Sequence, residues 1–198
     1  MCSYWGTGVP LRPWSAPAGS NGWGDGLHAE QISVTRSSVP TLEEYVEEIR
    51  PIFETRNLTN DGPLHRRLEH ELRDFLGVRH VTLYTNGHTA LEGVLQTMGL
   101  GRDGRDEVIT TPFTFASTTH AIVRSGLTPV MCDVRPDDLT LDPEAAEALV
   151  TERTCAIVPV HVYGNLCDDA ALRRVAGRHG LRLVYDAAHA FGEARGGE

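Results

Sequence analysis

Five short apolar runs alternate with segments of helical periodicity between residues 80 and 186, and this alternation limits the possible folds most strongly. The runs hold mostly Val, Ile and Leu without polar alternation, which is typical of a parallel sheet covered on both faces. The order therefore predicts a doubly wound α/β fold with a mainly parallel sheet and right-handed crossovers. The predicted strands are His80–Thr85, Glu107–Thr111, Pro129–Val134, Cys155–Val160 and Arg182–Asp186, and the predicted helices between them are Thr89–Met98, Ser117–Ser125, Pro143–Val150 and Asp169–His179.

Two more helices are predicted before this alternation begins. Thr41 and Glu44 have the spacing of a capping box, and apolar residues then recur at helical intervals over residues 42–54. Leucines and a phenylalanine share one face of residues 64–76, and Gly77 follows as a suitable C-terminal cap.

Residues 1–30 are rich in Gly, Pro, Ser and Trp without periodicity, which predicts a flexible N-terminal arm ahead of a folded domain at residues 31–198. The net charge of -9 argues against nucleic acid or an anionic membrane as a partner, because both require clustered positive charge. No apolar run reaches the length of a membrane span, and residues 1–14 lack the features of a secretion signal. We therefore expect a cytoplasmic protein.

The four cysteines form no CxxC pair, so reduced structural thiols are expected. The nine histidines show no HExxH or His/Cys spacing, and no metal site is predicted.

Several polar or aromatic residues follow the predicted strands directly, where ligands of open α/β sheets bind. Asp186 ends the last apolar run, and His189 follows it, so both are candidates for a ligand site. The alternative is that Asp186 only caps a helix and that His189 is an ordinary turn residue. The Asn-Gly turn before His88 and Thr89 leaves free amides at a helix N-terminus, which suits a phosphate, although a plain turn has the same sequence. Phe115 is suited to cover a planar ring, or else belongs to the core.

These motifs, taken in order with the His-x-Tyr-Gly-Asn segment that begins at His161, resemble the DegT/DnrJ/EryC1/StrS aminotransferases. This family comprises pyridoxal-phosphate-dependent sugar aminotransferases of the aspartate-aminotransferase fold, known as fold type I. The resemblance extends from about residue 32 to residue 192, and includes Leu58–Pro63, Glu107–Pro112 and Pro159–Asn165.

The resemblance implies a cofactor role for five residues. Asp186 would pair with the pyridine nitrogen of pyridoxal phosphate (PLP, or PMP in its amino form) and keep that nitrogen protonated, so that the ring withdraws electrons. His189 would reach the ring substituents, and Phe115 would stack on the ring. The amides of His88 and Thr89 would hold the phosphate, although the family usually has threonine at the position of His88.

Three residues are expected on the substrate side, two from the resemblance and one from its position. Thr59 and Asn60 match a loop near the mouth of the active site, and His161 lies at the same sheet edge as Asp186.

One family feature is missing from this sequence. All 18 basic residues are arginine, whereas the family's catalytic lysine lies a few tens of residues beyond the Asp186 segment. No catalytic residue is therefore assigned in this chain. We expect residues 31–198 to be the N-terminal part of the PLP-binding large domain, with its C-terminal part and the small domain absent and one sheet edge exposed.

Three functions remain open at this point. The first is part of an aminotransferase that moves an amino group from an amino acid, with glutamate as the expected donor, to a nucleotide-linked keto sugar in amino-sugar biosynthesis. Such an enzyme would act as a homodimer. The second is a PMP-dependent sugar dehydratase of the same family, in which histidine replaces the lysine. The third is a non-catalytic fragment or partner without the Schiff-base lysine.

Overall fold

The computed structural model describes residues 39–59 and 61–194, so the predicted arm and Asn60 lie outside the described residues. Within this part of the chain, no helix is long and apolar enough to cross a membrane. The chain divides into two compact units, residues 1–55 and residues 56–198.

The described part of the first unit is helix α1 (Leu42–Thr55). The predicted capping box is present, because the Glu44 amide donates to Thr41 Oγ1 at 3.3 Å and the Thr41 amide donates to the Glu44 carboxylate at 2.8 Å. The helix therefore begins at the predicted residue.

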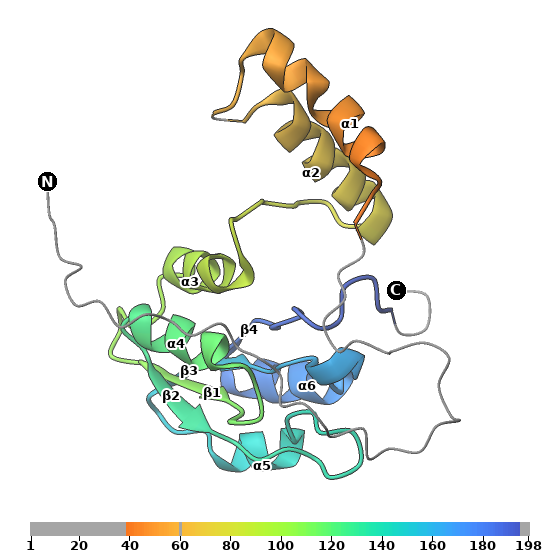
Figure 1. The fold of residues 1–198 in the computed structure, drawn as a ribbon. Helices are drawn as coiled ribbons and strands as arrows, with labels where there is room; N and C mark the ends of the chain where they lie inside the picture. The colour runs from red at the N-terminus through yellow and green to blue at the C-terminus, as the bar shows by residue number, and fades with distance from the viewer. Residues whose placement is uncertain (1–38, 60, 195–198) are drawn as a thin grey trace, which may run out of the picture. The chain divides into compact units, whose positions relative to one another are not determined.

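The second unit is a four-stranded parallel sheet with helices on both faces, in the strand order β2-β1-β3-β4 (Figure 1). Each crossover between its strands contains a helix, as parallel pairing requires. Its elements are α2 (Pro63–Leu76), α3 (Gly87–Thr97), β1 (Glu107–Thr110), α4 (Ala116–Arg124), β2 (Thr128–Met131), α5 (Pro143–Ala148), β3 (Thr154–Val158), the 3-10 helix η1 (Val162–Gly164), α6 (Asp169–His179) and β4 (Arg182–Leu183). The predicted doubly wound α/β fold is confirmed.

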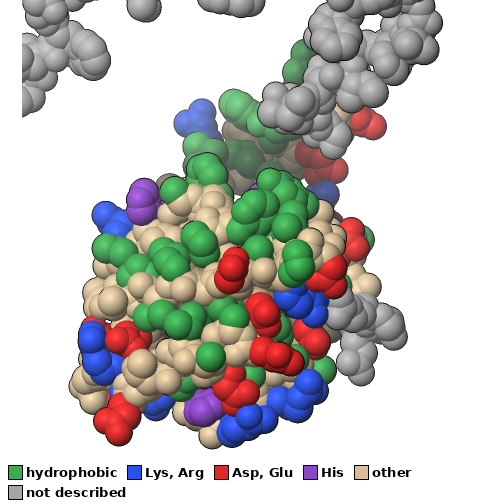
Figure 2. Space-filling view, turned by 90° about the horizontal axis from the view of Figure 1, so that it is seen from below, with side chains coloured by type: hydrophobic (Ala, Val, Ile, Leu, Met, Phe, Trp, Pro, Cys, Tyr) green, Lys and Arg blue, Asp and Glu red, His purple; other side chains and the backbone are tan. Residues whose placement is uncertain are grey.

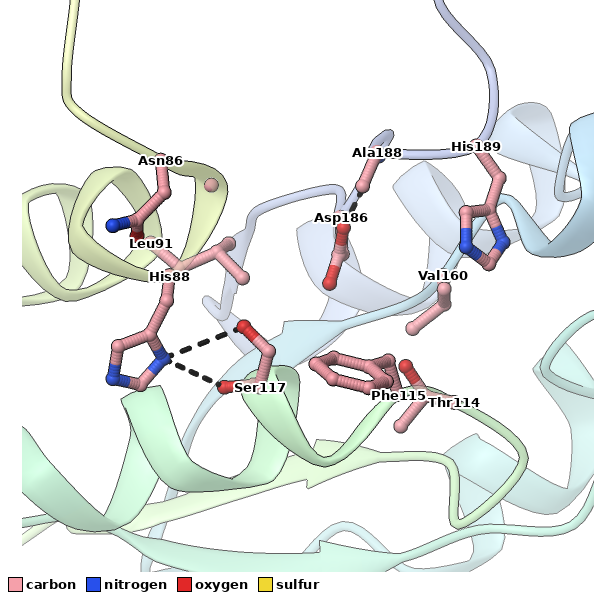
Figure 3. Close-up of a pocket in the computed structure, with 11 residues that line it drawn as sticks. Asn86, His88, Leu91, Thr114, Phe115, Ser117, Val160, Asp186, Ala188 and His189 are labelled. Atoms are coloured by element: carbon pink, nitrogen blue, oxygen red, sulfur yellow. Dashed lines mark hydrogen bonds between the residues drawn. The ribbon is translucent and has the colours of Figure 1, made fainter. Parts of the chain in front are cut away.

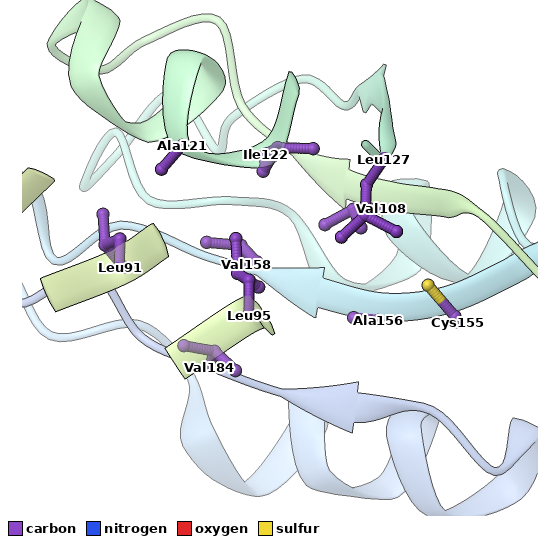
Figure 4. Packing of buried hydrophobic residues seen from close by; sticks show 10 residues of the cluster. All are labelled: Leu91, Leu95, Val108, Ala121, Ile122, Leu127, Cys155, Ala156, Val158 and Val184. Atoms are coloured by element: carbon purple, nitrogen blue, oxygen red, sulfur yellow. The ribbon is translucent and has the colours of Figure 1, made fainter. Parts of the chain in front are cut away.

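Each face of the sheet has its own hydrophobic core. On one face, apolar residues of α3 and α4 pack against alternate residues of β1 and β3, among them Val108 and Val158 (Figure 4). On the other face, residues of α5 and α6 pack against Ile109 and Ile157. All five residues of β3 are buried, which explains why the predicted strand has no polar alternation.

The predicted strand His80–Thr85 is wrong. Its backbone runs as irregular chain into a bend at Thr85, and no described strand pairs with it. The apolar composition indicates burial, but a strand also requires a partner, and the side chains here are half-buried or exposed.

The last predicted strand is shorter than expected. β4 ends at Leu183, and further along the chain Asp186 forms an isolated parallel bridge with Val160. Asp186 therefore remains fixed at the carboxyl end of the sheet.

Charged side chains of both signs on the surface of the described residues form ion pairs. Arg153 and Asp106 form an ion pair at 2.8 Å, and Arg173 and Asp169 form another at 2.6 Å. On the face drawn in Figure 2, apolar side chains take up much of the upper and middle part, and acidic and arginine side chains are mixed toward the lower part and the sides, so the described residues of this face form no broad basic patch.

Candidate functional site

A cavity of about 380 Å³ lies at the carboxyl end of the sheet, between the start of α3, the loop before α4 and the segment after β4 (Figure 3). Its volume is in the usual range for small-molecule sites. The cavity brings together four of the predicted site residues, Asp186, His189, Phe115 and His88. Its lining consists of Asn86, Gly87, His88, Leu91, Thr114, Phe115, Ser117, Val160, Asp186, Ala188 and His189.

The backbone of Asp186 is held by the residues that follow β3. Its amide donates to the Pro159 carbonyl at 3.0 Å, and its carbonyl accepts from the His161 amide at 3.0 Å. These two bonds continue the parallel pairing beyond the last strand and place the side chain at the cavity.

The Asp186 carboxylate is oriented by α4. Its Oδ2 accepts a 2.7 Å hydrogen bond from the hydroxyl of Thr118, a residue that is only 1% exposed. Because the Thr118 hydroxyl has one proton, the 2.8 Å bond between Thr118 and Thr114 must be donated by Thr114. The Oδ1 accepts from the Ala188 amide at 3.2 Å. Asp186 thus bonds to a backbone amide of the following turn, as the alternative interpretation expected, but its carboxylate also lines the cavity.

The N-terminus of α3 forms another wall of the cavity. Asn86 caps the helix, and its side-chain oxygen accepts from the Thr89 amide at 2.9 Å. The Thr89 hydroxyl also bonds to the backbone carbonyl of Asn86 at 2.9 Å. Asn86 thus occupies the Thr89 amide, which the sequence predicts as a phosphate contact, and Thr89 does not line the cavity. The first-turn amides of Gly87 and His88 have no carbonyl partner within the helix, so these two are the amides suited to an anion.

The His88 side chain links α3 to α4. Its Nδ1 lies 3.3 Å from both the carbonyl and the hydroxyl oxygen of Ser117, and its Nε2 lies 3.1 Å from Glu92 (Figure 3). Glu92 also pairs with Arg124. The imidazole therefore links the two helix N-termini on one side of the cavity.

Phe115 immediately precedes α4 and is 75% exposed, so the alternative of a core phenylalanine is wrong. In Figure 3 its ring lies below Asp186. This ring is available to a planar ligand in the cavity.

His189 is oriented by a backbone contact. Its Nδ1 accepts from the Tyr163 amide at 3.3 Å, which places the proton of the neutral imidazole on Nε2. The two rings stack with centroids 5.8 Å apart and an angle of 4° between their planes. His189 can therefore donate a hydrogen bond from its other nitrogen.

The structure does not bring Thr59 or His161 into this lining. Thr59 lies in an exposed bend before α2. The His161 ring stacks on Tyr185 at 4.7 Å, and its Nδ1 accepts from the Cys167 amide at 3.1 Å. A burial effect and a hydrogen bond to Asp169 raise the pKa of Tyr185, which keeps this neighbouring hydroxyl protonated.

One group of possible metal ligands lies away from this cavity. Asp61, His65 and Glu69 place their ligand atoms within 4.8 Å of one another near the start of α2. The guanidinium of Arg66 lies 3.2 Å from the Asp61 carboxylate and competes with a cation for it. The prediction of no metal site stays a prediction.

The sequence model of the DegT/DnrJ/EryC1/StrS aminotransferase family matches residues 41–198. A dTDP-4-amino-4,6-dideoxy-D-glucose transaminase of Escherichia coli is 41% identical over 166 residues, which are 84% of this chain and 44% of the relative. The chain thus spans less than half the length of this curated relative.

Two solved structures extend the likeness to three dimensions. DesI, determined in the presence of its TDP-sugar product, is 41% identical with a TM-score of 0.71, and the match covers 76% of this chain and 37% of DesI. NtdA from Bacillus subtilis, determined with bound PMP, is 29% identical with a TM-score of 0.70, and the match covers 82% and 39%.

Proposed function

Since the chain belongs to the DegT/DnrJ/EryC1/StrS aminotransferase family, we propose that it is the cofactor-binding part of a PLP-dependent nucleotide-sugar aminotransferase. Its sheet has the parallel α/β architecture of fold type I aminotransferases. The enzyme would take an amino group from an amino acid, with glutamate as the proposed donor, and pass it to a nucleotide-linked keto sugar.

The single observation that carries this proposal is the placement of Asp186 in the cavity, opposite the N-terminus of α3 and next to Phe115. A carboxylate suits a protonated pyridine nitrogen, free helix amides suit a phosphate, and an exposed aromatic ring suits a planar ring. The residues present therefore fit PLP. When bound, this cofactor supplies an electron-withdrawing ring that stabilises negative charge on the substrate carbon.

The chain's own residues would each perform one task. Asp186 would hold a proton at the pyridine nitrogen, and Thr118 would keep that carboxylate aimed into the cavity. The amides of Gly87 and His88 would bind the phosphate oxygens, while Phe115 would cover the ring and exclude water. His189 would donate from Nε2 to an oxygen on the ring.

Transamination is proposed in preference to sugar dehydration, because the matched relatives are named as transaminases or aminotransferases. On the same likeness we propose a homodimer and a cytoplasmic location. We also propose that the substrate side of the site includes Thr59, Asn60 and His161. Residues 31–198 would then form the N-terminal part of the large domain.

The test is a PLP titration of the 198-residue chain, followed by absorbance, with Asp186→Ala as the comparison. We expect weak non-covalent binding that the substitution removes. Borohydride reduction and mass analysis should show no side-chain adduct, because the sequence has no lysine. Equal binding by the chain and by Asp186→Ala would contradict the proposed cofactor site.

A further inference from the structure

Asn86 and Gly87, the residues that open α3, form a pair with a reactivity of its own. In an Asn-Gly pair the backbone nitrogen of the glycine can attack the side-chain amide carbon of the asparagine, because glycine has no side chain to obstruct the approach. The sequence contains this pair twice, at Asn21-Gly22 and at Asn86-Gly87. The second pair lines the proposed cofactor cavity, where Asn86 is exposed (Figure 3).

The nitrogen of Gly87 is available for this attack. It belongs to the first turn of α3, where a backbone amide has no carbonyl partner within the helix. The positive end of the helix dipole also lies here, and it stabilises the negative charge that the nitrogen acquires when it loses its proton. Asn86 itself is extended, with a φ of -166° and a ψ of 167°, so the residue that must change conformation lies outside the helix.

The side-chain carbonyl of Asn86 is polarised by the same helix. Its Oδ1 accepts from the Thr89 amide at 2.9 Å, and the Thr89 hydroxyl lies 3.3 Å from the same oxygen. Attack by the Gly87 nitrogen turns this oxygen into an oxyanion, and donors that already point at it stabilise the new charge. The leaving nitrogen, Nδ2, is held more loosely, by a 3.5 Å hydrogen bond to the Thr85 hydroxyl.

We propose that Asn86-Gly87 is a site of spontaneous deamidation. The Gly87 nitrogen forms a bond to Cγ of Asn86, the bond between Cγ and Nδ2 breaks, and the proton of the Gly87 amide leaves with Nδ2 as ammonia. Water then opens the resulting cyclic imide. Opening at Cγ gives aspartate at position 86, and opening at the backbone carbonyl carbon gives isoaspartate. The reaction requires no reactant other than water.

The modification changes the charge of the cofactor cavity and keeps the helix cap. Aspartate caps a helix about as well as asparagine, so α3 persists. The new carboxylate brings a negative charge next to the Gly87 and His88 amides. The consequence for the cofactor rests on the proposed function, which places the cofactor phosphate on these two amides. Deamidation then weakens cofactor binding because two anions compete for one helix end, and a bound phosphate in turn protects the Gly87 nitrogen.

The first experiment incubates the 198-residue chain in mildly alkaline buffer and follows its peptides by mass analysis. We expect the Asn86 peptide to gain the mass difference between an amide and an acid, and to separate into aspartate and isoaspartate forms. Gly87→Ala should lose this gain, because its methyl group obstructs the nitrogen. An added Cβ at Gly87 meets no described atom within 4 Å, so α3 tolerates the substitution.

Inorganic phosphate tests the link to the anion site in the same incubation. It should slow the mass gain at Asn86, because a phosphate bound to the Gly87 amide keeps the proton on that nitrogen. The mass gain at Asn21 should not change with phosphate, and this second Asn-Gly pair of the same chain serves as the matched reference.

The second experiment is a PLP titration of Asn86→Asp, which reproduces one product. We expect PLP to bind about tenfold to hundredfold more weakly, the effect of one added like charge a few ångströms away in a partly exposed site. Thermal unfolding should be nearly unchanged, because the cap is kept. Gln96→Glu makes the same change from amide to carboxylate at an exposed position of α3 outside the cavity, and should leave PLP binding unchanged.

No mass gain at Asn86, or an equal gain in Gly87→Ala, would overturn the modification site. Equal PLP binding by the chain and by Asn86→Asp, or a rate at Asn86 that phosphate does not change, would overturn its link to the cofactor. These failures differ from that of the proposed function, which the titration of Asp186→Ala tests. If PLP does not bind while Asn86 deamidates through Gly87, the cofactor site is wrong and the modification site stands.

Discussion

Thr118→Val isolates the contact that orients the proposed cofactor carboxylate. The substitution preserves the volume of the side chain and removes only the hydroxyl that donates to Asp186 at 2.7 Å. Thr118 is 1% exposed, so water cannot take the place of the lost donor from that side. Thr114 also loses the acceptor of its hydroxyl proton.

Two magnitudes follow from this geometry. A hydrogen bond to a charged group contributes about 1.5–3 kcal/mol to folding, and we expect a stability loss in that range. Cofactor affinity should fall less, because Asp186 keeps its bond from the Ala188 amide and the cofactor must only fix the loosened carboxylate again. Fixing one side chain costs about 0.5–1.5 kcal/mol, which corresponds to a roughly twofold to twelvefold weaker Kd for PLP.

The assay pairs urea denaturation with the PLP absorbance titration. Thr118→Ser keeps the hydroxyl and should restore most of the affinity, while Thr119→Val makes the same substitution one residue further along α4 as a control. If Thr118→Val binds PLP as tightly as the unsubstituted chain while Asp186→Ala does not bind, α4 does not orient the carboxylate and the argument fails.

Three other properties should respond to defined changes. Gly180→Ala should destabilise the protein by about 1 kcal/mol in urea denaturation, because Gly180 ends α6 at a φ of 63°. Gly177→Ala lies inside the same helix with open space around it and should stabilise the protein by about 0.5–1 kcal/mol. If both substitutions change the free energy of unfolding in the same direction, the argument about the cap is refuted. Burial raises the pKa of the Cys132 and Cys167 thiols to about 11, so both should resist iodoacetamide at pH 8 in the native state and react on unfolding, as read by peptide mass analysis. Hydrogen bonds from Arg153 lower the pKa of Asp106, so the ionised Asp106 stabilises the fold above its unfolded-state pKa, and this contribution is lost as the pH falls through the lower folded-state pKa. Asp106→Asn should therefore flatten the decline of thermal stability below about pH 4, and an unchanged decline would refute this role of Asp106.

The sequence predicted the helices well because their ends carry local signals. Gly77 adopts the left-handed conformation expected of its predicted role as a C-terminal cap, and Gly180 does the same directly after the predicted end of α6 at His179. α5 begins at Pro143 as predicted, and the side chain of Asp142 caps it. Each of these features depends on a few consecutive residues, so no tertiary information is required to recognise them.

Strand ends were predicted less well because pairing depends on distant residues. Leu183 pairs with Ile157, and the Val184 amide donates to the Ile157 carbonyl at 3.1 Å, but the rest of the predicted strand forms only a bridge from Asp186 to Val160, beyond the end of β3. The segment His80–Thr85 has the composition of a strand without a described partner. Apolar periodicity reports which side chains are buried, and it contains no information about which backbone lies alongside.

The site shows the same division between local and distant information. Asp186, Phe115 and His189 could be found from the sequence because each follows a strand end or opens a helix, and such positions gather at one edge of a parallel sheet. Thr118 could not be found in this way, since 68 residues separate it from Asp186 and a buried threonine on a helix has no distinctive pattern. The resemblance guided the roles of these residues, and the structure supplied the contacts that hold them.

These contacts make the cofactor site depend on the packing of α4 against the sheet. Thr118 lies one helical turn before Ala121 and Ile122, both fully buried in the core beside β1 and β3. The core therefore determines the position of the Thr118 hydroxyl relative to the sheet, while the backbone hydrogen bonds of Asp186 to Pro159 and His161 fix the position of the Asp186 backbone. Because a packed core tolerates little displacement, the same apolar contacts that stabilise the fold also determine where the carboxylate points.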